Sequence, residues 1–306
     1  MAPHEARQSV IERLLAASAG SVRGRVWIIS DLQILGEYED FVTTAVEDFR
    51  SLELACDAVW YLGDAVASGG PDDMAAMARF QIDALRGLGL PVRYVIGNHD
   101  FDYSLSPRTP EPLALPFYDL FKSVPGWRTT ASIEDFYFTE ELGEFLVVFL
   151  SDHADREGRW VCTQGKVHRD AASYPHGPGA YAALRRRMAE CGRPVITAGH
   201  YAFTGGSRPS PMLDRLLPLP ESVRLHVHGH QHVGDASVRD PDFQRKISTV
   251  TRQKVPQINV SAIERRRADQ VRSVVLEVHA DRTLGVFFRD HDRRAWAECY
   301  VLDEGR

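Results

Sequence analysis

Five short polar segments hold the side chains of this chain that are best suited to chemistry, and each follows an apolar stretch. They are Asp31-Leu32-Gln33, Gly63-Asp64, Gly97-Asn98-His99-Asp100, Gly199-His200 and Gly229-His230-Gln231-His232. Together they offer carboxylate, amide and imidazole groups, a donor set that suits Mn, Fe or Zn and does not suit a soft thiolate metal. Glycine or another small residue near each segment lets the backbone turn sharply and present these groups. The pattern therefore predicts a metal site assembled from segments far apart in the chain.

The elements that must position these residues form alternating strands and helices. Apolar strands are expected at 25–29, 58–62 and 92–96, with helices at 41–54 and 71–88 between them. Such a βαβαβ alternation predicts parallel strands covered by helices. Two later strands, 195–198 and 223–227, lead to His200 and to the run that ends at His232. Because sites in open α/β sheets lie at the carboxyl ends of the strands, we expect the five segments to meet there.

The rest of the chain is expected to complete two sheets. A strand pair at 133–139 and 145–150 surrounds Gly143, a helix follows at 180–190, and strands at 271–278, 284–289 and 296–302 form an antiparallel meander. Segment 151–179 lacks apolar periodicity and is expected to be a long loop, a feature that is often functional in a compact domain. These patterns predict two sheets packed face to face with helices outside. We expect one domain over 23–306, preceded by an amphipathic helical extension over 1–22.

In their order, the five segments resemble the signature of the calcineurin-like metallophosphoesterases, which is DxH, GD, GNH[DE], H and GHxH. The resemblance implies an α/β fold, a four-layer αββα sandwich of two mixed β-sheets flanked by helices. It also implies two divalent metal ions, which would be Mn, Fe or Zn, with Mg as a further option. Asp64 would bridge them, with Asp31, Gln33 and His232 at one metal and Asn98, His200 and His230 at the other. Two metals about 3.5–4 Å apart can clamp the attacking and leaving oxygens of a phosphate.

The same resemblance implies catalytic roles. His99 would stabilise developing charge over the substrate and help to protonate the leaving oxygen, with Asp100 tuning it. A hydroxide that bridges the metals would attack phosphorus in line. The expected activity is hydrolysis of a phosphate ester or anhydride by a small-molecule phosphodiesterase or nucleotide diphosphatase. A phosphomonoesterase or protein phosphatase with the same core, and a catalytically weak binding scaffold, are the alternatives.

Gln33 is the one departure from the signature, which has histidine at this position. An amide oxygen is a weaker ligand than imidazole for a divalent transition metal. This metal site is therefore expected to bind more weakly, or to prefer harder ions such as Mn. The D-x-Q motif also resembles that of manganese-dependent ADP-ribose and CDP-alcohol diphosphatases, which favours a small nucleotide diphosphate or a cyclic phosphate as the substrate. Gln33 is the only support for the scaffold alternative.

Candidates for substrate contact lie outside the signature. Four residues are singled out, namely Arg156, Arg159 and His168 in the long loop and Tyr201 after His200. Arginine binds phosphate through bidentate hydrogen bonds, although a solvated loop with scattered charge is the simpler interpretation. Asp152 and His153 belong to the same loop. The aromatic residues Tyr103, Tyr201 and Phe203 could stack a base or pack in the core or at its rim.

Histidine occupies every second position from His226 to His232. In one extended strand all four side chains would lie on the same face. His230 and His232 fit GHxH and are the expected ligands. We expect His226 to be structural and His228 to support a ligand.

Composition limits the classes of partner. The 306 residues carry a formal net charge of −6, and the 4 cysteines form no CxxC pair. The acidic balance disfavours a nuclease, and the cysteine spacing predicts neither a disulfide framework nor a thiolate zinc site. The charged residues within 9–19 argue against an export signal, and no apolar run reaches the roughly 20 residues of a membrane span. We therefore expect a cytoplasmic protein that acts on a small phosphorylated substrate, with a nucleotide among the candidates. We expect no nucleic-acid or membrane partner, and the oligomeric state stays open.

Overall fold

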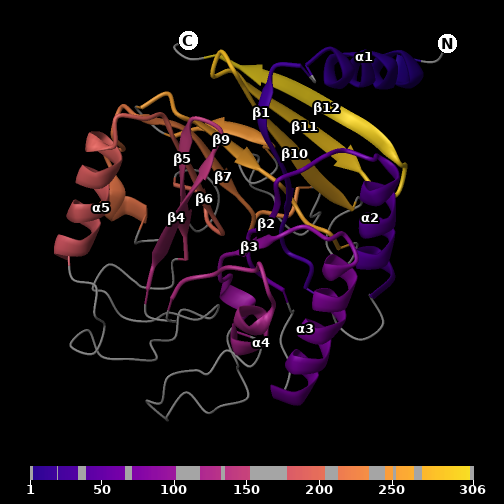
Figure 1. Cartoon of the computed structure of the whole chain (residues 1–306), viewed down its shortest axis with the longest axis horizontal. Coiled ribbons are helices and arrows are strands. Elements are labelled where there is room, and N and C mark those ends of the chain that lie inside the picture. The colour runs from indigo at the N-terminus through magenta and orange to yellow at the C-terminus, as the bar shows by residue number, and fades with distance from the viewer. Residues whose placement is uncertain are drawn as a thin grey trace.

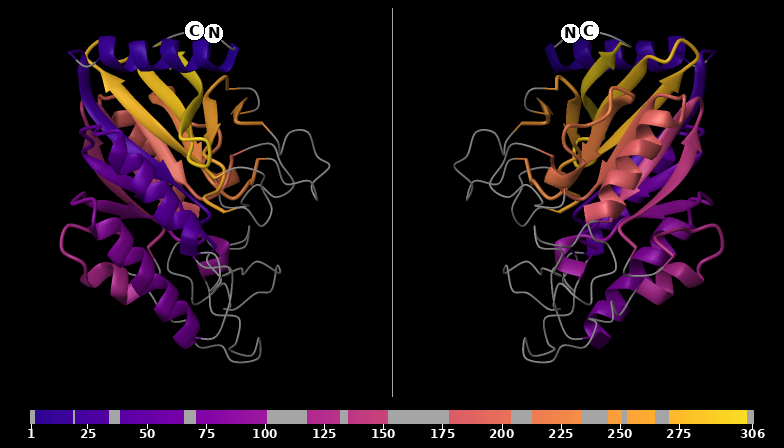
Figure 2. Two further views of the ribbon diagram at one scale, coloured as in Figure 1. Left: turned by 90° about the vertical axis from the view of Figure 1, so that its right-hand side faces the viewer. Right: turned by 90° about the vertical axis from the view of Figure 1, so that its left-hand side faces the viewer.

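Two six-stranded β-sheets packed face to face form the centre of the molecule (Figure 1). The computed structural model describes residues 3–18, 20–33, 39–65, 71–100, 118–131, 135–151, 178–203, 213–233, 245–250, 253–264 and 271–303. Helices lie on the outer side of both sheets, so that the layers follow one another as helix, sheet, sheet and helix (Figure 2). The predicted αββα sandwich is therefore confirmed.

The first sheet has the strand order β12-β11-β10-β1-β2-β3. Its strands are β1 (Val22–Ile29), β2 (Ala58–Tyr61), β3 (Val92–Tyr94), β10 (Arg272–His279), β11 (Leu284–Asp290) and β12 (Ala295–Leu302). β1, β2 and β3 are parallel and are connected by α2 (Glu39–Ser51) and α3 (Pro71–Arg86), whereas β10, β11 and β12 are antiparallel. Both the βαβαβ unit and the final meander match the sequence-based prediction.

The second sheet has the order β4-β5-β6-β7-β9-β8. Its strands are β4 (Tyr137–Leu142), β5 (Phe145–Leu150), β6 (Val195–Gly199), β7 (Val223–His228), β8 (Ile247–Thr249) and β9 (Pro256–Asn259). The inner strands β5, β6, β7 and β9 are parallel, and the edge strands β4 and β8 are antiparallel to their neighbours. The helix α5 (Pro178–Glu190) precedes β6. Shorter helical pieces are α4 (Tyr118–Ser123), η2 (Asn98–Asp100) and η4 (Leu213–Leu216).

Two differences from the expected elements concern this second sheet. The strand expected at 133–139 is displaced along the chain, because β4 runs up to the hairpin turn at Gly143, whose φ of 55° suits glycine. The strands β8 and β9 were not predicted. They are only three and four residues long, too short for an alternating pattern to stand out.

The alternation along β1 shows how one strand serves two cores. Val26 and Ile28 belong to the apolar layer between the sheets, which they share with Phe149 of β5. Trp27 points the other way and stacks on Phe49 of α2, with ring centroids 4.2 Å apart. Because side chains alternate with a period of two, a strand covered on both faces is apolar throughout. This continuous run of apolar residues is what identifies the strand in the sequence.

A helix is present in the expected N-terminal extension, as α1 (Pro3–Ser18), which lies across β12 (Figure 1). Ile11 and Leu15 are buried one helical turn apart. The Gln8 side-chain oxygen accepts a hydrogen bond from the backbone N–H of Trp296 at 2.6 Å. The helix is thus docked on the first sheet, while the division of the chain at residue 22 stays a prediction.

A buried ionic network joins α2 to the first sheet. Asp48 is fully buried and receives hydrogen bonds from Arg289 at 2.8 and 2.9 Å and from His291 Nδ1 at 2.7 Å. Burial alone would raise the pKa of Asp48, but the hydrogen bonds from Arg289 and His291 lower it to about 2. Ser273 Oγ accepts from Trp27 Nε1 at 2.7 Å and lies 2.7 Å from His291 Nε2. Both oxygens of Asp48, both ring nitrogens of His291 and the Trp27 indole N–H therefore have protein partners.

We expect Asp48→Asn to lower the free energy of unfolding by about 3–5 kcal/mol at neutral pH, because it leaves Arg289 buried without its counter-charge. The pKa of Asp48 is lower in the folded chain than its ordinary value of 3.8. Its stabilisation is therefore present above about pH 4 and is lost as the pH falls towards 2, and the variant should lack this part of the acid dependence. Urea unfolding at several pH values measures both effects.

A matched control is Glu144→Gln, which breaks the exposed pair between Glu144 and Arg282. Its effect should stay below about 1 kcal/mol. Equal effects of the two substitutions would contradict the assignment of the Asp48 network as a structural ion pair.

Candidate metal centre

The loops that follow β1, β2, β3, β6 and β7 converge at the carboxyl ends of these strands. The backbone N–H of Asp31 donates to Gly63 O, and that of Gln33 donates to Asp64 O, both at 3.0 Å. Asp31, Asp64 and His230 have φ angles of 52°, 55° and 64°. The left-handed region is rare for residues with a side chain, and such strain is typical of functional sites. Segments from Asp31 to His232 thus meet as the sequence predicts.

Two glycines permit this convergence. A Cβ atom on Gly97 would overlap the backbone nitrogen of Asp64, and a Cβ atom on Gly229 would overlap the hydroxyl oxygen of Ser30. Any other residue at either position would push the loops apart. The glycines of the GNHD and GHQH segments are therefore required by the close approach of neighbouring loops.

Asp64, His200 and the half-buried His230 form a group whose potential ligand atoms all lie within 4.8 Å of one another. His200 Nδ1 donates to Leu62 O at 2.7 Å, which turns Nε2 towards Asp64 Oδ2 at 3.3 Å. Burial, together with the charge of His200, lowers the pKa of His230 to about 3. His230 is therefore a neutral imidazole with a lone pair to offer. One carboxylate and two imidazoles are a donor set that a divalent transition metal accepts.

A second pair lies beside this group. His232 Nε2 is 2.9 Å from Asp31 Oδ1, and Asp31 Oδ2 accepts from Ser30 Oγ at 2.6 Å and from the backbone N–H of His230 at 2.8 Å. The carboxylates of Asp31 and Asp64 are both buried. The structure thus places residues predicted for the two metals next to each other.

The histidines show that this region demands positive charge. Burial alone would lower the pKa of both His200 and His232. The nearby carboxylates instead raise the pKa of His200 to about 9, mainly through Asp64, and that of His232 to about 10, mainly through Asp31. Burial would likewise raise the pKa of Asp64, but His200 and His99 hold it well below its ordinary value. A bound divalent cation would satisfy the same negative potential, so the donor set fits a metal in charge as well as in chemistry.

Gln33 lies inside this site, and its Nε2 donates to Asp64 Oδ2 at 3.0 Å. It is buried, with 2% of its surface exposed. The amide therefore contacts the carboxylate expected to bridge the metals. Its role as a direct ligand stays a prediction.

The GNHD segment adopts the turn η2 beneath the site. The backbone N–H of His99 donates to Asp64 Oδ1 at 2.7 Å, and the His99 residue is half-buried. The Asn98 side chain lies outside the described part of the chain. Asp100 accepts hydrogen bonds from the backbone N–H groups of Asp64 at 3.0 Å and of Ala65 and Gly97 at 2.6 Å, and from the Tyr94 hydroxyl. Burial and the charge of Asp64 raise the pKa of Asp100 to about 7.

These contacts give Asp100 a role that the sequence did not predict. Its carboxylate fixes the backbone that carries Asp64, and the tuning of His99 stays a prediction. The support continues outward, because Gln81 Nε2 donates to Ala65 O at 2.7 Å and Gln81 Oε1 accepts from the Tyr61 hydroxyl at 2.6 Å. α3, β2 and β3 therefore hold the loop of Asp64 through buried polar groups.

The predicted substrate contacts are only partly described. Arg156, Arg159 and His168 lie outside the described residues, as do Asp152, His153 and Tyr103. Tyr201 is half-buried at the edge of the site, with its ring centroid 4.7 Å from that of His230. Phe203 is fully buried and packs against His226 at 4.4 Å. Tyr201 thus keeps its candidate role, whereas Phe203 is a core residue.

The histidine run does not continue as one strand. β7 ends at His228, and the left-handed conformation of His230 breaks the alternation. The buried His226 donates from Nε2 to Tyr201 O at 2.8 Å and lies 2.9 Å from Thr197 Oγ1, in agreement with the structural role expected of it. His228 is also buried and donates to Gly229 O at 2.9 Å. Burial lowers the pKa of His228 to about 4, so that it adds no charge beside the predicted ligands.

Glu264 is a site residue that the sequence analysis missed. Its Oε1 atom is 2.7 Å from His232 Nδ1, and 2% of the residue is exposed. It follows β9, which lies beside β7 in the sheet. The alternating apolar and polar residues of segment 258–263 before this acidic residue are the available signal. That signal is weak because the segment lacks the glycine and histidine of the other segments.

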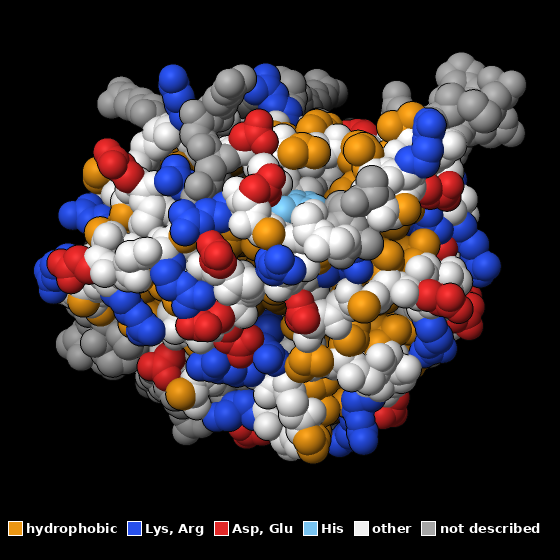
Figure 3. All heavy atoms as spheres, turned by 45° about the horizontal axis from the view of Figure 1, so that its top comes forward, with side chains coloured by type: hydrophobic (Ala, Val, Ile, Leu, Met, Phe, Trp, Pro, Cys, Tyr) orange, Lys and Arg blue, Asp and Glu red, His pale blue; other side chains and the backbone are white. Residues whose placement is uncertain are grey.

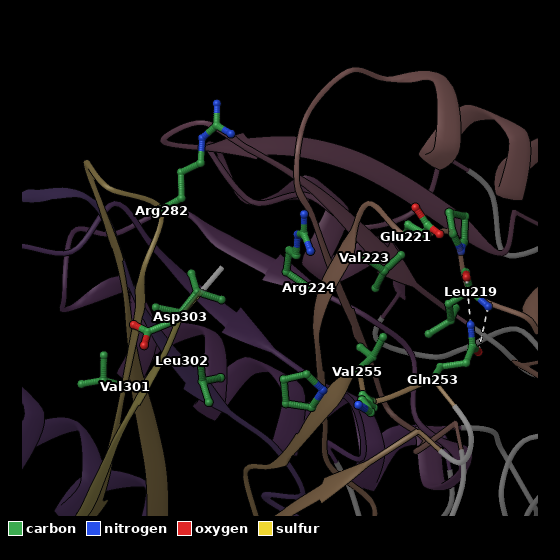
Figure 4. A pocket seen from close by; sticks show the side chains of 14 residues that line it. Leu219, Glu221, Val223, Arg224, Gln253, Val255, Arg282, Val301, Leu302 and Asp303 are labelled. Carbon is green, nitrogen blue, oxygen red and sulfur yellow. Dashed lines mark hydrogen bonds between the residues drawn. The ribbon is translucent and has the colours of Figure 1, made fainter. Parts of the chain in front are cut away.

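A large cavity of about 650 Å³ lies elsewhere (Figure 4). Its lining includes Val223 and Arg224 at the start of β7, Leu284 at the start of β11 and Leu302 at the end of β12. These positions are at the end of the sheets opposite to the predicted ligands. The cavity is therefore separate from the candidate metal centre.

The surface on the side of α1 has mixed charge. Among the described residues, Lys and Arg side chains lie between Asp and Glu, with apolar side chains among them (Figure 3). A protein that tracks nucleic-acid phosphates would gather its cations in one stripe. Among the described helices, none combines the length with the apolar character needed to cross a bilayer.

Comparison with known proteins places this geometry in context. A family model described as calcineurin-like phosphoesterase matches residues 24–234. A comparison with curated proteins finds no match.

Solved structures share the fold at low sequence identity. A dimetal phosphatase from Danio rerio aligns with a TM-score of 0.61 and 13% identity, over 92% of this chain and 99% of that one. Purple acid phosphatase PPD1 from yellow lupin seeds aligns with a TM-score of 0.57 and 14% identity, over 92% of this chain and 53% of that one. GAP50, the anchor in the inner membrane complex of Plasmodium, aligns with a TM-score of 0.53 and 12% identity, over 93% of this chain and 90% of that one. Identity this low speaks for the fold alone.

We expect Asp64→Asn to remove most of the divalent metal from the purified protein, because Asp64 contacts both groups of predicted ligands. Elemental analysis after purification in Mn-containing buffer measures the loss. Asp57→Asn is the matched control, since Asp57 precedes the same strand at its other end and is exposed. Full metal content in the Asp64 variant would show that it is not a shared ligand.

Proposed function

The chain belongs to the calcineurin-like phosphoesterase family, and from this premise we propose that it hydrolyses a small phosphodiester or a nucleotide diphosphate. The family establishes a metal-dependent phosphoesterase. The observation that carries the finer proposal is the cluster of Asp64, His200 and His230 with the buried Gln33 hydrogen-bonded to Asp64. This arrangement combines a donor set suited to a metal with a D-x-Q motif, which resembles the corresponding motif of nucleotide diphosphatases.

Two divalent cations would be held by this chain, with Asp64 between them. Asp31, Gln33 and His232 would complete one site, and Asn98, His200 and His230 the other. When bound, such ions supply a Lewis acid for the phosphoryl group and help to generate a nucleophile from water at neutral pH. Mn is the proposed preference at the site of Gln33, because an amide oxygen suits a harder ion.

His99 would act on the leaving group. Its backbone donates to Asp64, so its half-buried side chain begins beside the proposed bridging carboxylate. From this position a protonated imidazole could stabilise charge on the phosphoryl oxygens and give its proton to the leaving oxygen. Tyr201, packed against His230, is proposed to flank the substrate.

The charge balance of the chain favours a small substrate. A net charge of −6 disfavours binding along the phosphates of a polynucleotide. A cytoplasmic location belongs to the proposal as well. Cys56, Cys191 and Cys299 are free thiols, which suits a reducing compartment.

The alternatives rest on the fold. Two neighbours are phosphatases by name, which keeps a phosphomonoesterase in view. GAP50 is named as an anchor, which shows that this fold also occurs in a protein with a structural description. The intact donor set of Asp31, Asp64, His200, His230 and His232 argues against a decayed site in this chain.

A hydrolysis screen separates these functions. The full chain is assayed with Mn, Mg, Fe or Zn against mononucleotides, cyclic nucleotides and nucleotide diphosphates such as ADP-ribose. We expect the highest turnover with Mn and a diphosphate or cyclic phosphate. Faster turnover of mononucleotides would favour the phosphomonoesterase. No turnover with any combination of metal and substrate would favour the scaffold.

We expect His99→Ala to retain metal and to lose about 10²–10⁴ in rate, the usual contribution of general acid–base catalysis. The loss should be smaller for nitrophenyl esters, whose leaving group needs no proton. Steady-state rates and metal content together test this role. An equal loss for good and poor leaving groups would mean that His99 only positions the substrate.

We expect Gln33→His to tighten one of the two metal sites and to shift its preference towards Fe or Zn, because imidazole is the stronger donor to later transition metals. Metal titration after chelation, compared between wild type and variant, measures the change. Gln33→Ala is the companion variant, since it removes both the possible ligand and the hydrogen bond to Asp64. If the histidine variant binds metal as the wild type does, Gln33 acts through Asp64 or faces the substrate.

A further inference from the structure

We infer that Glu264 is a positioning residue, which holds His232 with Nε2 directed at the metal beside Asp31. The inference rests on the proposed function, in which His232 is a metal ligand. Three side chains form a continuous chain of contacts, since His232 lies 2.7 Å from Glu264 Oε1 through Nδ1 and 2.9 Å from Asp31 Oδ1 through Nε2. All three are buried.

The geometry selects one ring nitrogen. An imidazole binds a metal through a nitrogen that carries a lone pair, and the hydrogen bond of the other nitrogen decides which one that is. The Glu264 carboxylate can only accept, so it keeps the proton on Nδ1. Nε2 is then the nitrogen that a metal ion beside Asp31 would bind in place of its proton. A carboxylate behind the ring also makes the imidazole a stronger ligand.

The backbone around Glu264 is tied to both loops that carry these ligands. Ile263 N–H donates to Ser30 O at 3.1 Å, next to Asp31. Val233 N–H donates to Ser261 Oγ at 3.2 Å, next to His232. The segment therefore fixes the position of Glu264 relative to Asp31 and to His232 at the same time.

The turn before Glu264 is built for this purpose. Ser261 has a φ of 71°, and its N–H donates to Asn259 Oδ1 at 2.9 Å. Arg272 N–H donates to Ala262 O at 3.0 Å and links the turn to β10. The strained turn is hydrogen-bonded to both sheets and places the Glu264 carboxylate against the His232 ring. Precise positioning of a metal ligand requires such a fixed partner.

Metal titration of Glu264→Gln and Glu264→Ala tests the inference. Chelator-stripped full-length protein is titrated with Mn²⁺, and free Mn²⁺ is followed by electron paramagnetic resonance. We expect one of the two sites to weaken by about 10–100-fold in Glu264→Ala, the range seen when the partner of a ligating histidine is removed. Glu264→Gln keeps an acceptor for Nδ1 without the charge, so its affinity should lie between wild type and the alanine variant.

Asp48→Asn is the matched control, because Asp48 and His291 form another buried carboxylate–histidine pair, at 2.7 Å. It should lower the melting temperature without changing either Mn²⁺ affinity. Melting curves of the metal-free variants show that each one is folded before it is titrated. A folded Glu264→Ala protein that binds both ions as the wild type does would overturn the inference.

The inference and the proposed function fail in different ways. If the wild type binds two ions and hydrolyses no phosphoester, the proposed function fails while a weakened site in the Glu264 variants still supports the inference. If the wild type hydrolyses substrate and the Glu264 variants keep full affinity, only the inference fails. A wild type that binds no ion at the site of His232 would overturn the inference directly.

Discussion

Buried negative charge at the carboxyl ends of the strands is the constraint around which the rest of this structure is arranged. Asp31, Asp64, Asp100 and Glu264 are each at most 2% exposed. An ionised carboxylate away from water costs several kcal/mol unless it is paired and hydrogen-bonded. At Asp100, backbone N–H groups offset part of this cost, and burial still raises the pKa to about 7. The other three rely on histidines, whose raised pKa values reveal an unmet demand for cations. The charge pattern thus explains the architecture of the loops and why their donor set suits a cation.

Holding that charge requires a rigid frame. The left-handed conformations of Asp31, Asp64 and His230 cost about 1–3 kcal/mol each. Parallel strands covered on both faces provide the compensating stability, and hydrogen bonds between neighbouring loops transmit it to the predicted ligands. Gly97 and Gly229 let the loops approach closely enough for those bonds to form. The αββα sandwich is therefore the source of the precision at its edge.

The sequence predicts the parts of this structure whose signals are local. β1, β2 and the final meander are continuous apolar runs, and the polar segments at strand ends identify Asp31, Asp64, His200 and His230 before any fold is known. β8 and β9 escape prediction because they are short, and Glu264 escapes with them. The role of Asp100 also depends on which backbone groups surround it, and those come from another loop. The contacts of Glu264 and Asp100 arise from tertiary packing, so the spacing of residues in the sequence does not indicate them.

Three buried histidines show that the partner of one ring nitrogen does not by itself determine whether a histidine can bind a metal. His226 is held by the Tyr201 carbonyl and the Thr197 hydroxyl, so both nitrogens are used by groups that cannot exchange for a metal. His291 has a carboxylate at Nδ1, as His232 has, but its Nε2 meets Ser273, whose oxygen is also bound by Trp27. Only at His232 does the second nitrogen face another buried carboxylate, Asp31. The same carboxylate–histidine unit is therefore closed off in the first sheet and open to a cation at the strand ends, and what lies beyond Nε2 makes the difference.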